Sequence, residues 1–241
     1  MGKKYRLELH VHTKYSHDSI MPFWILYLKC RLCGITHIAI TEHNNIDGAM
    51  AFREYCLAKG NQLKVIIGEE IMTTDGEIIG LFLNKEINPM QSPCETINAI
   101  LAQNGVVYVP HPFDKKRYKT VLVEKAILEN KDKINCIECH NGRNISSEYS
   151  LMQERIADKY GLFKVIGSDA HTIFEVGRNY MDVEVEPRDV QSFMDAIKNA
   201  TFHKSNCLKF CHTITKFARL IKFVQKGDFD GLYRVINKRI R

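Results

Sequence analysis

The chain has 241 residues, of which 45% are hydrophobic and 26% charged, and its formal net charge is +6. These proportions exclude disorder as the main state, and at roughly 150 residues per domain the length predicts one large domain, alone or with a small appendage. No apolar run approaches the roughly 18 residues of a membrane span, and the first residues form no apolar signal segment. We therefore predict a cytoplasmic protein without a membrane span, and the positive charge weakly indicates an anionic partner.

Short β-branched runs alternate with amphipathic helical stretches along the chain. The strands are predicted at residues 5–11, 36–41, 64–71, 77–83, 105–110, 134–139, 163–168 and 180–186. The helices are predicted at residues 22–33, 47–59, 94–103, 121–130, 147–160 and 187–200. Gly34, Gly60 and Gly161 follow three of these helices, where a left-handed cap is favoured. Repeated strand–helix units of this length predict an α/β fold with a mostly parallel sheet and outer helices.

The segment after about residue 205 has a different pattern. It is helical and amphipathic, with Ile214, Phe217 and Ile221 among lysines and arginines. Packing against the main domain is favoured over binding a partner or an acidic membrane surface. We therefore predict a main domain over residues 1–204 and a basic amphipathic helical extension over residues 205–241, packed on or beside it.

Eight cysteines in a chain without a leader are expected to be reduced thiols. Cys30 with Cys33, and Cys136 with Cys139, have the C-x-x-C spacing of a zinc site. The first pair lies in a predicted helix, and the second lies in a predicted strand, where residues three apart point to opposite faces. Buried apolar thiols are therefore favoured over a zinc ribbon.

Histidines and carboxylates gather at the carboxyl ends of the predicted strands. In a parallel α/β fold these ends meet on one face, so side chains far apart in the sequence converge. Imidazole and carboxylate supply the N and O ligands of divalent ions, and two histidines in an H-x-H pair share a strand face. A metal site is therefore predicted from His10, His12, Asp18, His43, Glu69, Glu70, His111, Asp169 and His171.

Five segments carry a resemblance to a known family. Residues 10–18 (H-V-H-T-K-Y-S-H-D) resemble the H-x-H-T-x-x-S-x-D motif of the polymerase and histidinol phosphatase (PHP) family. Residues 41–44 resemble its T-[DE]-H-N motif, residues 68–70 its G-x-E, residues 111–112 its H-P and residues 167–172 its G-S-D-A-H-T, all in the family's order. The resemblance implies a distorted (β/α)7 TIM-like barrel that holds two to three divalent ions, either zinc, manganese or iron.

The resemblance also implies three overlapping ion sites. The first would be formed by His10, His12, Glu70 and Asp169. Glu70 would bridge to a second ion shared with His111, and Glu69 is an alternative for the bridging role. The third would be formed by Asp18, His43 and His171.

One position departs from the family pattern. Glu77 stands where the family often has a histidine ligand, so the occupancy of the second site stays open. A carboxylate there is still a candidate ligand. Glu138 is implied to support a ligand side chain without touching an ion.

The chemistry implied by the resemblance is hydrolysis of a phosphoester by a metal-activated water, with Glu70, Asp169 and His171 as catalytic residues. Arg143 and Arg178 follow two of the motifs closely. A guanidinium suits a phosphate, although structural ion pairs are equally expected for both arginines.

Several functions stay open within this prediction. The leading hypothesis is a stand-alone phosphoesterase acting on a small nucleotide, such as a 3′,5′-bisphosphate, or on the 5′ end of short RNA. Histidinol phosphate is an alternative substrate. A non-catalytic metal-containing binding or regulatory module is a second hypothesis. A nucleic-acid-binding protein that uses Lys115, Lys116, Arg117 and the basic tail is a third. The oligomeric state is not predicted.

Overall fold

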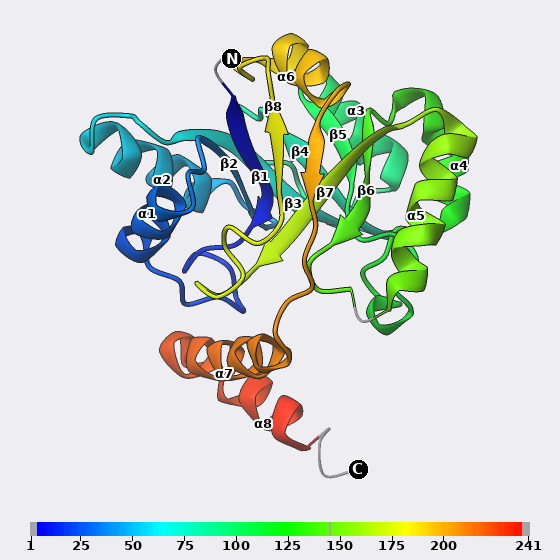
Figure 1. Ribbon diagram of the computed structural model, residues 1–241. Coiled ribbons are helices and arrows are strands. Elements are labelled where there is room, and N and C mark those ends of the chain that lie inside the picture. Colours follow the sequence, from blue (N-terminus) through cyan, green and yellow to red (C-terminus); the bar gives the residue numbers. More distant parts are fainter. Residues whose placement is uncertain (1–3, 145, 238–241) are drawn as a thin grey trace.

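Seven strands close into a barrel in the computed structural model, which describes residues 4–144 and 146–237 (Figure 1). The barrel closes because the first strand pairs with both the second and the seventh. The predicted distorted (β/α)7 barrel is thereby confirmed. Its strands are β1 (Tyr5–Val11), β2 (His37–His43), β3 (Lys64–Thr73), β4 (Gly76–Leu81), β5 (Val106–Val109), β6 (Cys136–Asn141) and β7 (Phe163–Ala170).

Strand β4 runs against the direction of its neighbours. It pairs antiparallel with β3 and with β5, whereas the other barrel pairings are parallel. Thr74 and Asp75 connect β3 to β4 in a tight hairpin, and Gly76 takes a φ of +121°. The beginning of β4 therefore lies at the same end of the barrel as the carboxyl ends of the other strands.

Two further strands extend the sheet outside the barrel. β8 (Tyr180–Val183) pairs antiparallel with β1, and β9 (Thr201–His203) pairs antiparallel with β8. The predicted strand at residues 180–186 is thus shorter than expected. β9 was not predicted, because three residues are too few to show an alternating pattern.

The helices lie mostly around the outside of the barrel, with α1 and α2 on one side and α3, α4 and α5 on the other (Figure 1). Gly34, Gly60 and Gly161 have φ values of +70°, +90° and +65°, as their positions after three helices predict. The helices are α1 (Phe23–Leu32), α2 (Asp47–Ala58), α3 (Pro93–Leu101), α4 (Glu124–Asn130), α5 (Ser147–Tyr160), α6 (Val190–Ile197), α7 (Lys209–Lys226) and α8 (Phe229–Asn237), with short 3₁₀ turns η1 (Lys115–Arg117) and η2 (Lys131–Lys133).

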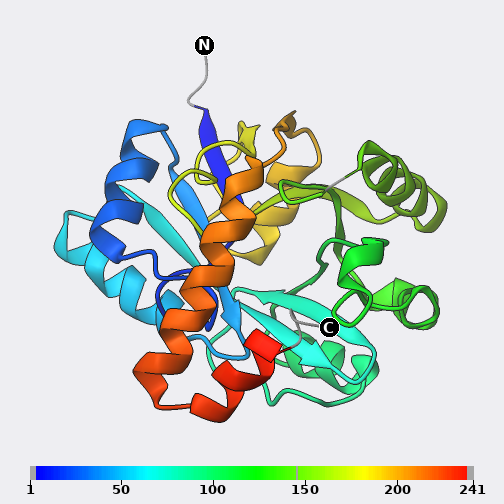
Figure 2. The same ribbon diagram turned by 90° about the horizontal axis from the view of Figure 1, so that it is seen from below.

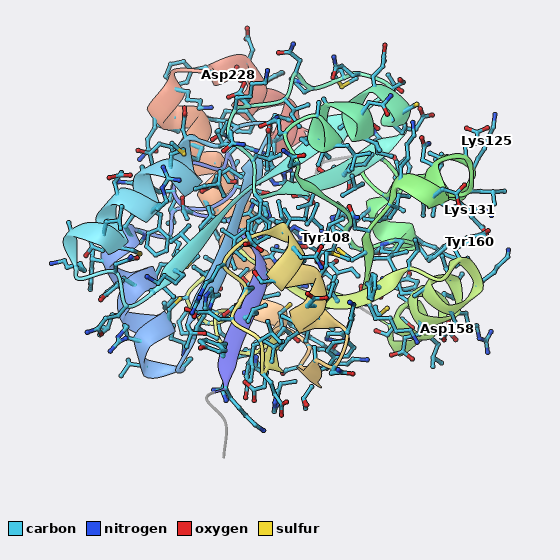
Figure 3. All side chains as sticks on the ribbon, turned by 90° about the horizontal axis from the view of Figure 1, so that it is seen from above. Tyr108, Lys125, Lys131, Asp158, Tyr160 and Asp228 are labelled. Atoms are coloured by element: carbon cyan, nitrogen blue, oxygen red, sulfur yellow. The ribbon has the colours of Figure 1, made fainter. Side chains whose placement is uncertain are left out.

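The barrel interior is apolar toward its amino-terminal end. Leu9, Ile79, Val106 and Tyr108 are buried there and form one cluster with Phe193 of α6. Figure 3 views the molecule from this end, with Tyr108 near the barrel axis and the labelled lysines on the periphery. Apolar side chains of the strands and of α6 therefore pack together at this end of the barrel.

The cysteines are free thiols. Cys136 belongs to the cluster inside the barrel, whereas Cys139 belongs to the cluster under the outer helices, so the pair points to opposite faces as predicted. Cys30 is also buried in the outer cluster. Within the described residues, no cysteine joins a group able to hold a metal ion, which removes support from the zinc-ribbon alternative.

Helix α7 lies across the carboxyl end of the barrel, followed by α8 (Figure 2). Both helices lie in the segment after residue 205, for which a helical pattern was predicted, and residues 238–241, with the last basic side chains, are outside the described part. In that described part, none of the helices combines the length and apolar character of a membrane span.

Candidate metal centre

Three predicted ligands stand in left-handed backbone at strand ends. The φ values are +66° at His10, +29° at His111 and +52° at Asp169. Non-glycine residues rarely adopt this region, at a cost of about 1–3 kcal/mol each. At His10 the pairing of β1 with both neighbouring strands is also irregular. These local turns direct the three side chains toward the barrel axis, which strict alternation along a strand would not do.

Four side chains meet at the centre of this end. His10 Nε2 lies 3.3 Å from Glu70 Oε1, and His12 Nε2 lies 3.4 Å from Glu70 Oε2. Both imidazoles also lie 3.6 Å from Asp169 Oδ1. All four residues are buried. The structure therefore brings together the set that the sequence assigned to the first ion.

A second group shares Glu70. His111 Nε2 lies 3.0 Å from Glu70 Oε1 and 3.5 Å from Glu77 Oε2. Glu77 reaches the group from the beginning of β4, because that strand runs antiparallel. Glu69, the alternative bridge, instead accepts a hydrogen bond from the Ile87 amide at 3.0 Å and lies outside the group.

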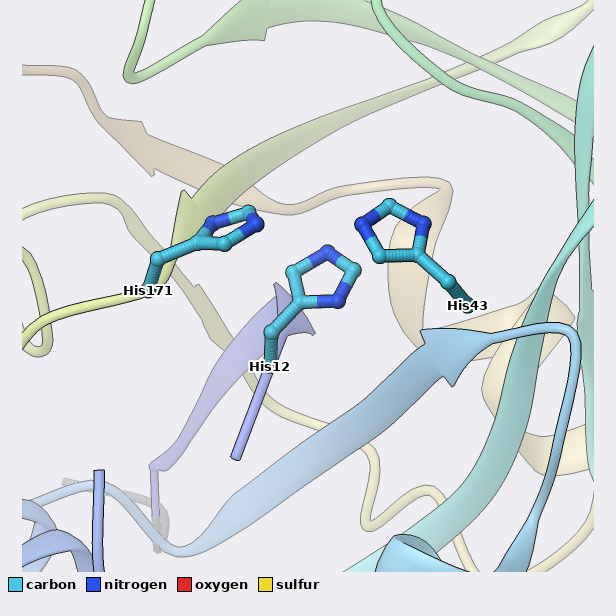
Figure 4. A group of neighbouring side chains, drawn as sticks. All are labelled: His12, His43 and His171. Carbon is cyan, nitrogen blue, oxygen red and sulfur yellow. The ribbon is translucent and has the colours of Figure 1, made fainter. Parts of the chain in front are cut away.

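A third group surrounds Asp18. Its Oδ1 lies 3.5 Å from His43 Nε2 and 3.2 Å from His171 Nε2. The ring of His12 stacks between those two imidazoles, with ring centroids 4.5 Å from His43 and 4.2 Å from His171 (Figure 4). The three groups thus form one continuous cluster of imidazoles and carboxylates.

The unpaired atoms of this cluster fit divalent cations. Among the described residues, His10 Nε2, His12 Nε2, Asp18 Oδ1 and Asp169 Oδ1 are buried and have no hydrogen-bond partner. Buried polar atoms are normally satisfied, and each of these four residues belongs to at least one group whose ligand atoms lie within 4.8 Å of one another. The N and O donor set is that of zinc, manganese or iron. The residues present therefore fit a metal cluster.

Glu138 on β6 supports two of these histidines. It accepts hydrogen bonds from His10 Nδ1 at 2.9 Å, from the His111 amide at 2.6 Å and from the Tyr108 hydroxyl. Asn141 Nδ2 donates to the same carboxylate at 2.9 Å. Glu138 therefore fixes the His10 ring so that Nε2 faces the cluster, which is the supporting role expected of it.

Glu42 fixes the orientation of the His12 ring through Ser16. Its carboxylate accepts hydrogen bonds from Ser16 Oγ, and from both the amide and the hydroxyl of Thr13. Ser16 Oγ in turn accepts from His12 Nδ1 at 3.0 Å. The sequence prediction did not single out Glu42, although its place beside His43 in the T-E-H-N segment was a usable signal.

Charge neighbours shift the pKa values of the carboxyl groups. Burial by itself would raise the pKa of Asp169, but the Arg117 guanidinium and adjacent histidines hold it well below its usual range. Burial, reinforced by the Glu70 carboxylate, raises the pKa of Glu77 to about 7. Glu77 is therefore the carboxyl group of the cluster that most needs a nearby cation to ionise at neutral pH.

The arginines near the centre differ in what they contact. Arg117 Nη2 lies 2.6 Å from Asp169 Oδ2, a contact that the sequence prediction did not anticipate. Arg143 binds Glu175 through two nitrogens, at 2.7 and 3.0 Å, so the structural ion pair considered for it is present. Arg178 donates to Ser205 Oγ at 2.8 Å, away from the cluster.

A cavity of about 730 Å³ opens onto the cluster. Asp18, His43, Glu77, Asp169 and His171 line its inner side. Its outer wall includes Arg117, Arg143 and side chains of α7. A volume in this range accommodates a small-molecule ligand.

Glu175 was missed by the sequence prediction. Its carboxylate accepts hydrogen bonds from the amides of His171 and Thr172, at 3.1 and 2.9 Å, and pairs with Arg143. No motif signalled this role, because the ion-pair partner Arg143 meets Glu175 only when the loop after β7 packs on the loop after β6.

Comparison with known sequences gives the family. The model of the PHP domain matches residues 8–240. The chain is 34% identical over 217 residues to an uncharacterised protein of Methanocaldococcus jannaschii, a match that covers 85% of each protein. A second uncharacterised protein of the same organism is 44% identical over 120 residues, which cover 45% of this chain and 68% of the relative.

Solved structures share the fold. A two-domain protein from Bacteroides vulgatus containing a predicted PHP-like metal-dependent phosphoesterase has a TM-score of 0.67 and 18% identity, over 84% of this chain and 66% of that one. The lesion-specific endonuclease of Pyrococcus furiosus has a TM-score of 0.59 and 16% identity, over 83% of this chain and 58% of that one. Since the family model spans nearly the whole chain, and the ligand cluster lies where its motifs meet, the chain belongs to the PHP domain family.

Proposed function

We propose that the protein is a metal-dependent phosphoesterase that hydrolyses a phosphomonoester or phosphodiester. The observation that carries the proposal is the set of buried, unpaired imidazole and carboxylate atoms at the bottom of an open cavity. The preferred substrates are a small nucleotide or the 5′ end of short RNA. Membership of the PHP domain family supports the same class of reaction.

Each ligand has a proposed place. Divalent ions bound here would supply an activated water at neutral pH and neutralise charge on the phosphoryl oxygens. Glu70, Asp169 and His171 stand at the reacting centre of the proposal. The first ion is assigned to His10, His12, Glu70 and Asp169, the second to Glu70, Glu77 and His111, and the third to Asp18, His43 and His171.

Two arginines of the chain are placed to bind the phosphate group of the substrate. Arg117 reaches the cluster directly and can bind a phosphoryl oxygen while it orients Asp169. Arg143 lines the cavity, and its pairing with Glu175 holds it in place for the phosphate-binding role proposed for it. Arg178 lies outside the lining, so Arg117 and Arg143 are better placed than Arg178 to bind a phosphate.

The test is phosphate release from a panel of esters, with manganese or zinc added and EDTA as control. The panel holds adenosine 3′,5′-bisphosphate, a 5′-phosphorylated oligoribonucleotide, histidinol phosphate and an aryl phosphate. We expect EDTA-sensitive turnover of a nucleotide substrate well above that of the aryl phosphate. Bound metal without any turnover would favour the non-catalytic module instead.

The division of the chain belongs to the same proposal. Residues 1–204 are assigned to the catalytic barrel and residues 205–241 to the basic extension, with residues 1–3, 145 and 238–241 outside the described part. A cytoplasmic location fits a phosphorylated metabolite or RNA as substrate. Fractionation of cells followed by immunodetection tests that location.

A further inference from the structure

Helix α7, which crosses the carboxyl end of the barrel (Figure 2), forms one wall of the cavity above the candidate metal centre. The side chains that it contributes are His212, Thr215, Lys216 and Arg219. Their spacing of three and four residues places them on one face of the helix. This face is polar and carries two permanent positive charges.

The opposite face of α7 is apolar and exposed. The exposed fractions are 60% for Phe217, 42% for Ile221 and 55% for Val224. The buried residues of α7, among those described, are the small Cys211 and Ala218. A helix held by apolar burial would point its large apolar residues inward, so polar contacts must contribute much of what places α7 over the cavity.

Those contacts tie α7 to loops of the candidate centre. Arg143 Nη2 donates to Thr215 Oγ1 at 2.7 Å, and Arg219 Nη2 donates to His17 Nε2 at 3.3 Å. Lys222 Nζ donates to the carbonyl oxygen of Lys14. The polar face of α7 is therefore held toward the cavity by the β1 and β6 loops.

Arg219 approaches Asp18 without covering its inner oxygen. The guanidinium lies 3.6 Å from Asp18 Oδ2, whereas Oδ1 faces His43 and His171. Lys216 lines the cavity, and in the part of the chain that the structure describes it forms no ion pair. Both cations thus face the cavity from outside the ligand cluster.

A cluster of ions would engage the phosphate that is hydrolysed, and Lys216 and Arg219 lie farther out. We propose that these two residues bind a second anionic group of the substrate, which makes α7 the specificity-determining element. The substrate class is a phosphate ester that carries another phosphate, as a nucleoside bisphosphate does. This inference rests on the proposed phosphoesterase function.

The test compares adenosine 3′,5′-bisphosphate with adenosine 5′-monophosphate on the full chain. Dissociation constants are measured by calorimetry with manganese and non-hydrolysable phosphonate analogues of both nucleotides, and KM values are measured with manganese and the nucleotides themselves. We expect the bisphosphate to bind at least about tenfold more tightly. Lys216→Gln should weaken that preference and leave the affinity for the monophosphate unchanged, because among the described residues Lys216 makes none of the contacts that hold α7. The double substitution Lys216→Gln and Arg219→Gln should remove the preference.

Lys226→Gln is the matched control, because Lys226 is on the same helix but outside the cavity lining. The Lys226→Gln variant should bind the bisphosphate more tightly than the monophosphate to the same degree as the unmodified protein. Equal affinities for the two nucleotides in the unmodified protein would overturn the inference without any variant, and so would a preference that survives the double substitution. If the protein binds the bisphosphate more tightly than the monophosphate but hydrolyses neither, the proposed phosphoesterase function is wrong and the inference about α7 stands.

Discussion

Asp169 presents its two carboxylate oxygens to different neighbours. Oδ2 pairs with Arg117, while Oδ1 faces His10 and His12. One oxygen is therefore held by the protein and the other is directed into the cluster. An amide at this position would keep the shape but lose the charge that offsets bound cations.

We therefore predict that Asp169→Asn abolishes turnover, with a fall of about a thousandfold, and lowers the bound metal while the fold survives. Metal content by mass spectrometry, turnover and circular dichroism are measured together. Asp195→Asn is the control, because Asp195 pairs with Lys198 on the exposed face of α6. Unchanged metal content and turnover in Asp169→Asn would remove Asp169 from the centre.

Substitution of Glu138 tests whether the residues that orient the candidate ligands affect metal binding. In Glu138→Gln the new amide group must face at least one of the donors that the carboxylate now accepts, namely His10 Nδ1, Tyr108 Oη or the His111 amide. We expect the metal affinity to fall about 10–100-fold, measured by titration against a chelator. Tyr108→Phe removes one donor and leaves the carboxylate, so it should cost less than Glu138→Gln, and the reverse order would contradict this role.

At the scale of the elements, the approach of β6 to β7 depends on a glycine. A Cβ at Gly167 would overlap Glu138 Oε1 and would lie 2.9 Å from the Tyr108 hydroxyl. The glycine of the G-S-D-A-H-T segment therefore makes room for the carboxylate that orients His10.

We predict that Gly167→Ala weakens metal binding although residue 167 touches no ion, and that overpacking lowers stability by about 1–3 kcal/mol. Gly161→Ala is the control. Gly161 has a φ of +65° and open space around its Cβ position, so it should cost about 1 kcal/mol of stability and leave metal affinity unchanged. Chelator titration and urea unfolding separate the two effects, and equal metal affinities in both variants would contradict the prediction.

The elements and the ligands were predictable to different degrees. The strands and outer helices followed from β-branched runs and amphipathic spacing, and the gathering of histidines and carboxylates followed from their positions at strand ends. Glu77, near the start of β4, was named only through the family resemblance. The reversed direction of β4 was not predicted, since strand patterning carries no sign of direction. The ion pairs of Arg117 with Asp169 and of Glu175 with Arg143 were not predicted either, because they depend on packing between loops that the sequence does not place.

At the scale of the whole molecule, the cluster concentrates ionised carboxylates and imidazoles in a buried volume. Ions that bind only the folded state stabilise it by mass action, by about 2.7 kcal/mol at a concentration 100 times the dissociation constant. For a chain of this length, that corresponds to a rise in Tm of roughly 5–10 °C. We predict this rise on adding manganese or zinc, measured by scanning calorimetry, and its reversal by EDTA. Asp169→Asn should show a much smaller rise, and identical curves with and without metal in the unmodified protein would contradict a resident metal cluster.

The pairing of β1 has a consequence for how the molecule assembles. Leu9 pairs with Gly167, and Tyr5 pairs with Val183, so β1 completes its ladders only with β7 and β8, which are synthesised much later than β1. Pairings between strands so far apart in the sequence slow folding, because the conformational entropy of the intervening chain is lost before the contacts form. During synthesis on the ribosome, His10 and His12 are made long before Asp169, another member of the proposed first ion site. The candidate ligand set therefore cannot be assembled in full until β7 has been made.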